Sequence, residues 1–299
     1  MSILVVGSIA LDSVETQQGK VTDSPGGSAL FFSASASFFA PVNLVGVVGE
    51  DFDFNHIDFL KNKNVDFMGL KVEKGETFRW GGRYHSNMNQ RDTLYTYLNV
   101  FETFKPSIPD KYRNSEYVFL ANIDPELQLQ VLASIPSPIL TVLDTMNFWI
   151  GGKREELQEV IKQVDVMILN DEEIRELTGI HNIHLAGKQL LTQGPRVLVV
   201  KKGENGAIMM TADDYFSAPA FPVENVVDPT GAGDCFAGGF LGYLATCSNL
   251  NNENFRKAVA YGTIIASFNV ESFSFNKLKE ISRQDIEGRM EIFRDMTRF

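Results

Sequence analysis

Short apolar runs alternate with longer helix-compatible stretches through most of this 299-residue chain. Runs of this kind are typical of parallel strands that are covered on both faces by helices. We therefore expect an α/β fold in which a mainly parallel sheet lies between layers of helices. The expected strands are residues 3–9, 42–48, 117–121, 139–143, 166–169, 197–200, 207–210 and 215–218. The expected helices are residues 28–40, 52–62, 126–134, 153–163, 171–177 and 184–193, and a further one that begins at residue 232.

Two segments, residues 13–25 and 67–100, do not follow this rhythm, because they are polar and rich in turn residues. We interpret them as a small β-sheet that projects from the main domain. Such a sheet would cover the carboxyl ends of the main strands, where ligands of open α/β sheets bind, and would act as a lid. No linker or repeat divides the chain, so we expect residues 1–299 to form a single domain.

Composition excludes several classes of function. The 44% apolar and 22% charged residues suit one large soluble domain, and the net charge of −11 argues against a protein that binds nucleic acid or an anionic membrane. Two cysteines are too few for a disulfide framework, which favours a cytoplasmic protein. Residues 26–49 carry no charge, but Pro41 and Asn43 divide them into a helix and a strand, so we expect no membrane span.

The segment Asp-Pro-Thr-Gly-Ala-Gly-Asp-Cys-Phe, residues 228–236, carries the clearest chemical signal. Its two glycines allow a tight turn at the start of a helix, where free backbone N–H groups can bind a phosphate. Asp234 follows in the first helical turn, placed to take a proton from an attacking hydroxyl. The segment therefore predicts phosphoryl transfer, although the glycines alone could form an ordinary turn and Asp234 could be a helix cap. No P-loop, dinucleotide fingerprint or serine-hydrolase elbow is present.

Five segments together resemble the ribokinase-like, or phosphofructokinase B (pfkB), family of small-molecule kinases. They occur in the family's order, and the resemblance covers essentially the whole chain. The segments are Gly26-Gly27, residues 46–51, residues 170–173, residues 202–207 and residues 228–236.

The resemblance implies a role for each residue of the glycine turn. Asp234 is the expected catalytic base, and the backbone of Gly231, Ala232 and Gly233 is the expected anion hole for the transferred phosphoryl group. Thr230, directly before this turn, is expected to contact the nucleotide.

The nucleotide side of the site is expected in two further segments. Asn170 and Glu173 match the family's Asn-x-x-Glu element, which acts near Mg²⁺ and the nucleotide phosphates, largely through water. Lys201, Gly203 and Gly206 match the nucleotide-binding loop. Simpler alternatives remain open, since the acidic segment could merely begin a helix and the loop could be a solvated turn.

On the acceptor side, Asp12 matches a family Asp that binds acceptor hydroxyls, at the end of the expected first strand. Gly26 and Gly27 match the glycines beneath the substrate and the lid, and Phe31 is expected to line the same site. Asp228 is expected either to fix the glycine loop or to help hold a monovalent cation such as K⁺.

The departures from ribokinases concern the acceptor. Ribokinases carry an Asn two positions before this Asp, and a Lys and an Asn after the glycine pair, where this chain has Ala10, Ser28 and Phe31. The pocket is therefore expected to be more apolar than one for a free pentose. Aromatic residues within 78–84 could stack on a ring or form the core of the lid, and an arginine of the lid could reach the phosphate or simply be solvated.

The sequence thus predicts a kinase that uses ATP and Mg²⁺, with K⁺ as a further candidate, and phosphorylates a hydroxyl of a sugar or sugar-like alcohol. A nucleoside kinase, an inositol kinase, a vitamin kinase of the same fold and a non-catalytic nucleotide- or sugar-binding regulator remain alternatives. A homodimer through the lid sheet is also expected, because residues 67–100 carry apolar side chains on an exposed sheet face.

Overall fold

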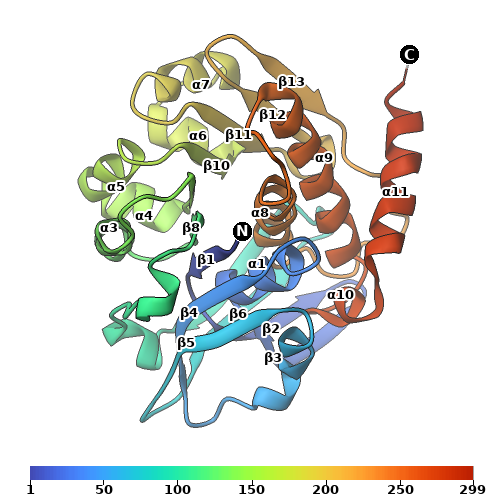
Figure 1. Ribbon diagram of the computed structural model, residues 1–299. Helices are drawn as coiled ribbons and strands as arrows, with labels where there is room; N and C mark the ends of the chain where they lie inside the picture. Colours follow the sequence, from blue (N-terminus) through green and yellow to red (C-terminus); the bar gives the residue numbers. More distant parts are fainter. Residues whose placement is uncertain (299) are drawn as a thin grey trace.

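The computed structural model describes residues 1–298, and within them a nine-stranded sheet forms the centre of the molecule (Figure 1). Its strand order is β13-β12-β11-β10-β9-β8-β1-β4-β5, parallel from β11 to β5 and antiparallel at the β12 and β13 edge. The strands are β1 Ile3–Val6, β4 Val42–Gly49, β5 Val65–Glu73, β8 Tyr117–Leu120, β9 Leu140–Asp144, β10 Val166–Asn170, β11 Val197–Lys201, β12 Ala207–Met210 and β13 Tyr215–Ala218. The predicted mainly parallel α/β architecture is confirmed.

Helices cover both faces of this sheet and bury two hydrophobic cores, one on each side (Figure 1). One face is covered by α1, α8, α9, α10 and α11, and the other by α3, α5, α6 and α7. The helices are α1 Ser28–Ala36, α2 Asp58–Lys61, α3 Pro125–Ser134, α4 Asn147–Gly152, α5 Arg154–Ile161, α6 Asp171–Thr178, α7 Ile183–Leu191, α8 Ala232–Leu244, α9 Asn252–Asn269, α10 Asn276–Glu280 and α11 Arg283–Met296. Short 3₁₀ turns occur at η1 Phe54–His56, η2 Asn99–Thr103, η3 Asp110–Tyr112 and η4 Gly203–Asn205.

A second, four-stranded sheet has the order β3-β2-β6-β7 and is built from β2 Ala10–Thr16, β3 Gly19–Gly26, β6 Phe78–Tyr84 and β7 Arg91–Tyr97. The outer pairs are antiparallel and the central pair, β2 with β6, is parallel. A separate small sheet is therefore present where the sequence predicts one. Whether it moves as a lid stays a prediction.

One part of the predicted lid belongs elsewhere. Residues 67–73 lie in β5, which pairs in parallel with β4 at the edge of the large sheet. An edge strand is covered less completely than a central one, so several of its side chains reach solvent and its sequence lacks the continuous apolar run of its neighbours. The predicted helix at residues 52–62 is also wrong in detail, because η1 and α2 replace it, and α4 was not predicted.

The packing of α1 against α8 fixes the direction of the helix that begins at the glycine turn. Gly238 and Gly242 lie one turn apart on α8, and a Cβ at Gly238 would lie 2.5 Å from the carbonyl oxygen of Phe32 in α1. A Cβ at Gly242 would lie 3.1 Å from the Cα of Ala36. The two backbones therefore approach closely only because these positions carry no side chain.

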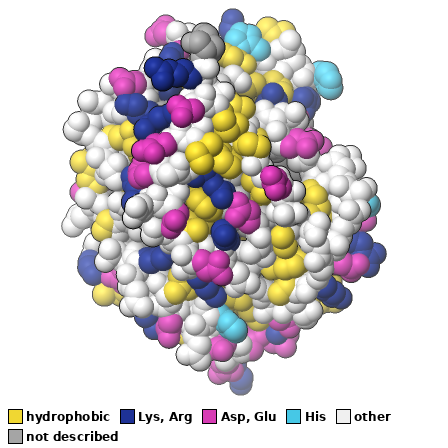
Figure 2. Space-filling view, turned by 90° about the vertical axis from the view of Figure 1, so that its right-hand side faces the viewer, with side chains coloured by type: hydrophobic (Ala, Val, Ile, Leu, Met, Phe, Trp, Pro, Cys, Tyr) yellow, Lys and Arg dark blue, Asp and Glu magenta, His cyan; other side chains and the backbone are white. Residues whose placement is uncertain are grey.

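Acidic and basic side chains are mixed over the face shown in Figure 2, with no large area of one sign. Among residues 1–298, no helix has the length and apolar character needed to cross a membrane.

Candidate active site

The glycine turn is strained in a way that only glycine relieves. Gly231 has a φ of +74°, in the left-handed region, and precedes the first residue of α8. The ring of Phe31 lies directly against Gly231, at the position that a Cβ would occupy. A side chain at position 231 would therefore meet both an unfavourable backbone conformation and the Phe31 ring.

The three predicted amides of this turn are not equivalent. The N–H of Ala232 donates to the carbonyl oxygen of Pro229 at 3.1 Å, so it is already used inside the turn. The N–H groups of Gly231 and Gly233 have no hydrogen-bond acceptor within residues 1–298. Of the three amides of the expected anion hole, that of Ala232 is thus occupied in this structure, and phosphate binding by this turn stays a prediction.

Asp234 lies in the first turn of α8 and is partly exposed beside these amides. Burial raises its pKa to about 7, and the negative charge of Asp144 adds to the effect, whereas Lys201 and Arg91 oppose it. A carboxyl group that titrates near neutrality suits a general base, because it can both accept a proton and be unprotonated at the working pH. The geometry is thus compatible with the role predicted for Asp234.

Lys201 and Asp144 form an ion pair beside the glycine turn. Lys201 ends β11 and Asp144 ends β9, and the distance from Nζ to Oδ1 is 3.3 Å. Sequence reasoning identified Lys201 but missed Asp144. The signal was available, because Asp144 directly follows the expected strand at residues 139–143, at the strand end where ligands bind.

Asn170 and Glu173 form a capping box at the start of α6. The Asn170 Oδ1 accepts from the N–H groups of Glu172 and Glu173, at 2.9 and 2.8 Å. The Glu173 Oε2 accepts from the N–H of Asn170 at 2.7 Å. The simpler alternative, a helix start, is therefore present in the structure, and it holds Glu173 beside the ion pair.

Asn170 and Glu173 are candidate ligands for Mg²⁺. The part of the chain that is described, residues 1–298, contains no group of three His, Cys, Asp or Glu side chains that could hold a metal alone. The capping box uses only one carboxylate oxygen of Glu173, Oε2. Burial raises the pKa of this carboxyl group to about 7. This donor set fits a Mg²⁺ ion that phosphate oxygens and water coordinate for the most part.

The predicted nucleotide loop contains η4 and two left-handed glycines, Gly203 with φ +53° and Gly206 with φ +82°. The turn between β6 and β7 reaches this loop. Asn89 in that turn lies against Gly203, and its Nδ2 donates to Oε1 of Glu204 at 3.4 Å. The second sheet therefore extends across the site to the loop expected to bind the nucleotide.

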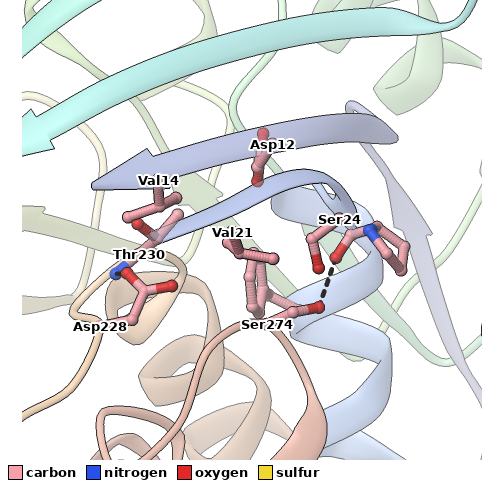
Figure 3. A pocket seen from close by; sticks show the side chains of 9 residues that line it. Asp12, Val14, Val21, Ser24, Asp228, Thr230 and Ser274 are labelled. Carbon is pink, nitrogen blue, oxygen red and sulfur yellow. Dashed lines mark hydrogen bonds between the residues drawn. The ribbon is translucent and has the colours of Figure 1, made fainter. Parts of the chain in front are cut away.

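The acceptor side is a pocket between the second sheet and the segment before α8 (Figure 3). Asp12 lies in β2, not at the end of the first main strand as predicted, since β1 ends at Val6. Its carboxylate lies directly over Gly26, where a Cβ would leave no room for it. The pocket is lined by Asp12, Val14, Val21, Ser24, Pro25, Phe31, Asp228, Thr230 and Ser274.

Asp12 is held in an environment that disfavours its charge. Burial, together with the nearby carboxylates of Asp228 and Asp234, raises its pKa to about 8, although a hydrogen bond from the backbone of Gly27 acts in the opposite direction. At neutral pH the free protein therefore keeps Asp12 largely protonated. Gly27 has φ +92°, and its Cα lies so close to the backbone of Ser8 that a side chain there would clash.

Asp228 fixes the glycine segment from inside. Its Oδ1 accepts from the N–H of Thr230 at 2.8 Å, and its side chain is 2% exposed. The carbonyl oxygen of Thr230 accepts in turn from Nδ2 of Asn269 at 2.9 Å. These contacts support the expected loop-fixing role of Asp228, whereas binding of K⁺ stays a prediction.

The residues of the predicted lid differ in what they contact. Phe78 is half-buried and stacks on Phe101 of η2 at a ring distance of 5.4 Å. Tyr84 instead meets the glycine segment, because its hydroxyl lies 3.2 Å from Oγ1 of Thr230. Of the arginines, Arg79 pairs with Asp51 at 2.9 Å, whereas the charge of Arg91 acts on Asp234.

Known proteins match this chain both in sequence and in fold. The family model described as pfkB family carbohydrate kinase matches residues 2–280. The chain is 28% identical over 270 residues to a cytidine kinase of Thermococcus kodakarensis, a match that covers 87% of this chain and 96% of that protein. It is 25% identical over 230 residues to a nucleoside kinase of Methanocaldococcus jannaschii, covering 77% of this chain and 73% of that protein.

Two solved structures show the same fold. The Methanocaldococcus jannaschii nucleoside kinase superposes with a TM-score of 0.76 at 22% identity, over 97% of this chain and 98% of that one. An E. coli ribokinase II in complex with ATP and Mg²⁺ superposes with a TM-score of 0.80 at 18% identity, over 97% of this chain and 99% of that one.

Proposed function

Because the chain belongs to the pfkB family of carbohydrate kinases, and is therefore a phosphotransferase with an alcohol acceptor, we propose that it transfers the γ-phosphoryl group of ATP to a hydroxyl of a nucleoside. The observation that carries the choice of a nucleoside is the likeness to a cytidine kinase, which extends over 96% of that protein. The composition of the acceptor pocket also supports a nucleoside as the acceptor. Val14, Val21 and Phe31 provide apolar walls for a base, and Asp12 provides a polar group for a hydroxyl.

In the proposed reaction the acceptor oxygen attacks the γ-phosphorus of ATP. The new bond joins the acceptor oxygen to phosphorus, the bond from phosphorus to the oxygen of the β-phosphate breaks, and ADP leaves. Asp234 takes the proton of the acceptor hydroxyl. The N–H groups of Gly231 and Gly233 stabilise the charge on the transferred group.

The second sheet excludes water in this proposal, because its β6–β7 turn already contacts the nucleotide loop through Asn89 and Glu204. Glu173 and, through water, Asn170 would hold Mg²⁺ beside the phosphates. When bound, the ion neutralises phosphate charge.

A panel of acceptors tests the substrate class. ADP release would be measured with ATP and Mg²⁺ in the presence of cytidine, uridine, adenosine or inosine, and compared with ribose, fructose, inositol, pyridoxal and hydroxymethylpyrimidine. We expect turnover with at least one nucleoside at a kcat/KM at least 10-fold above any free sugar, about 1.4 kcal/mol of discrimination. Faster turnover of a free sugar or inositol would replace the nucleoside by that acceptor, and turnover of pyridoxal or hydroxymethylpyrimidine would favour a vitamin kinase.

Asp234→Asn tests whether the protein is an enzyme. We expect kcat to fall by about 100-fold or more while ATP still binds, because the amide cannot accept the proton. Gly288→Ala is the matched control, since it lies in α11 with nothing within 4 Å of the added Cβ. A wild-type protein that binds ATP but phosphorylates nothing in the panel would instead support a non-catalytic regulator.

A further inference from the structure

Lys201 and Asp144 meet above the end of the strand that separates them. Their strands β11 and β9 both pair with β10, which ends at Asn170. The side chains are 18% and 8% exposed, so the 3.3 Å contact between Nζ and Oδ1 is shielded from water. Shielding strengthens such an interaction, because the solvent no longer screens the two charges.

The Lys201 side chain also lies along the glycine turn. A Cβ built on Gly233 would lie 2.9 Å from Nζ, 3.7 Å from Cε and 3.9 Å from Cδ of Lys201. Gly233 provides one of the two free amides and directly precedes Asp234. The ammonium group is thus at the edge of the surface on which a phosphoryl group would be bound.

Three carboxylates compete for this ammonium group. Burial alone would lower the pKa of Lys201, but Asp144, Glu173 and Asp234 raise it above its ordinary value, so the side chain stays charged. Of the three, Asp144 is the one that Lys201 contacts directly, at 3.3 Å. Without Asp144, the ammonium group would be drawn toward Asp234. Its positive charge would then oppose the transfer of the acceptor proton to Asp234.

We propose that Lys201 binds the transferred phosphoryl group through its ammonium and that Asp144 is the positioning residue that holds Lys201 against Gly233 and away from Asp234. The proposal rests on the proposed kinase function. Lys201 stays protonated throughout, so it forms no covalent bond and moves no proton. Its charge is matched to the negative charge that the phosphoryl oxygens carry during transfer.

The first test uses Lys201→Met and Lys201→Arg. We expect Lys201→Met to lower kcat by about 100-fold and to remove most of the preference for a non-hydrolysable ATP analogue over ADP in isothermal titration. The acceptor KM should change by less than about 3-fold, since Lys201 does not reach the pocket around Asp12. Lys201→Arg should restore part of the preference because it keeps the charge. Lys188→Met, an exposed lysine of α7, is the control.

The second test examines Asp144. Asp144→Asn should lower kcat by about 10-fold with the same loss of preference for the ATP analogue, and the double variant Asp144→Asn/Lys201→Met should be no worse than Lys201→Met alone. The double variant removes both charges of the ion pair, so it remains informative if Asp144→Asn alone unfolds. Thermal melting of each variant separates a loss of folded protein from a loss of binding.

Some outcomes would overturn the proposal. If Lys201→Met keeps the preference for the ATP analogue over ADP, Lys201 does not bind the terminal phosphoryl group. If Asp144→Asn keeps the wild-type kcat and preference, Asp144 does not position Lys201. The binding experiments need no acceptor, so a wild type that phosphorylates none of the panel would contradict the proposed function without deciding this inference.

Discussion

Asp12, the residue proposed to bind the acceptor hydroxyl, is a buried carboxyl group whose protonation affects folding stability. Its pKa is raised from 3.8 to about 8 in the folded protein, whereas in the unfolded chain the group has its ordinary value. Between about pH 4 and pH 8 the folded state therefore holds a proton that the unfolded state has lost. Folding stability must then decrease as the pH rises through this window.

We expect Asp12→Asn to stabilise the free protein at pH 7.5 by about 1–3 kcal/mol, because the amide needs no proton in order to be neutral. At pH 5 the gain should be clearly smaller. Urea denaturation at both pH values measures the difference, and the acceptor KM should rise in the same variant. An equal destabilisation at both pH values would show that the structural role of the carboxyl group outweighs its charge.

Asp234 leads to a separate pH prediction. Its pKa of about 7 means that the base is protonated below neutrality, so kcat/KM for the acceptor should fall as the pH decreases through 7. Arg91→Gln should move this acidic limb to higher pH, because the positive charge of Arg91 favours the carboxylate form of Asp234. Rates measured between pH 5.5 and 8.5 test both points. If the acidic limb of Arg91→Gln lies at the same pH as that of wild type, Arg91 is too far from Asp234 to change its pKa.

At the scale of elements, the β6–β7 hairpin makes two contacts with the rest of the site. Tyr84 meets Thr230 at 3.2 Å, and Asn89 meets the loop that contains Gly203 and Glu204. The hairpin thus contacts both the glycine segment and the loop expected to bind the nucleotide. The two contacts give the proposed lid a way to respond to bound ATP.

We expect ATP to slow amide hydrogen exchange in residues 85–90, and Asn89→Ala to remove most of this protection, because the loop contact is lost. The variant should bind ATP with an affinity within about 5-fold of wild type, the effect of roughly one hydrogen bond. Amide hydrogen exchange measured with and without ATP tests this protection, and α11 serves as the internal reference. Equal protection in the variant would mean that the hairpin does not respond through Asn89.

The sequence predicted elements well where one physical requirement dominated. Central strands such as β10 and β11 are buried on both faces, so their apolar runs revealed them. The glycine turn was recognisable because left-handed Gly231 permits no other residue. Strand β5 was assigned to the wrong sheet because an exposed edge resembles a polar loop. The position of Asp144 at the end of an expected strand was visible in the sequence, but its contact with Lys201, 57 residues away, is not shown by any local pattern.

For the whole molecule, the second sheet leaves apolar side chains unburied. Leu94 and Tyr97 on β7 are 49% and 57% exposed, and Leu98 follows at 41%. β7 is the outermost strand of its sheet, so a second copy of the chain could cover this edge. These observations support the predicted homodimer through the lid, which stays a proposal.

We expect wild type to sediment as a dimer and Leu94→Glu to sediment as a monomer, because a charge at a buried contact is unfavourable. Analytical ultracentrifugation measures both. Leu185→Glu, at an exposed leucine of α7 outside the second sheet, is the matched control. A dimer that persists in Leu94→Glu but separates in Leu185→Glu would move the interface to α7.

Asp12 belongs to β2, a strand of the second sheet, while Asp234 belongs to α8, which packs on the large one. Gly7, Ser8 and Ile9 connect β1 to β2, and Gly27 and residues 74–77 also connect the small sheet to the rest of the fold. If the small sheet moves, the carboxyl group proposed to bind the acceptor moves with it, and the acceptor is brought to the proposed base. Acceptor affinity would then include the work of bending these connections, and stiffer ones could alter it without touching either carboxylate.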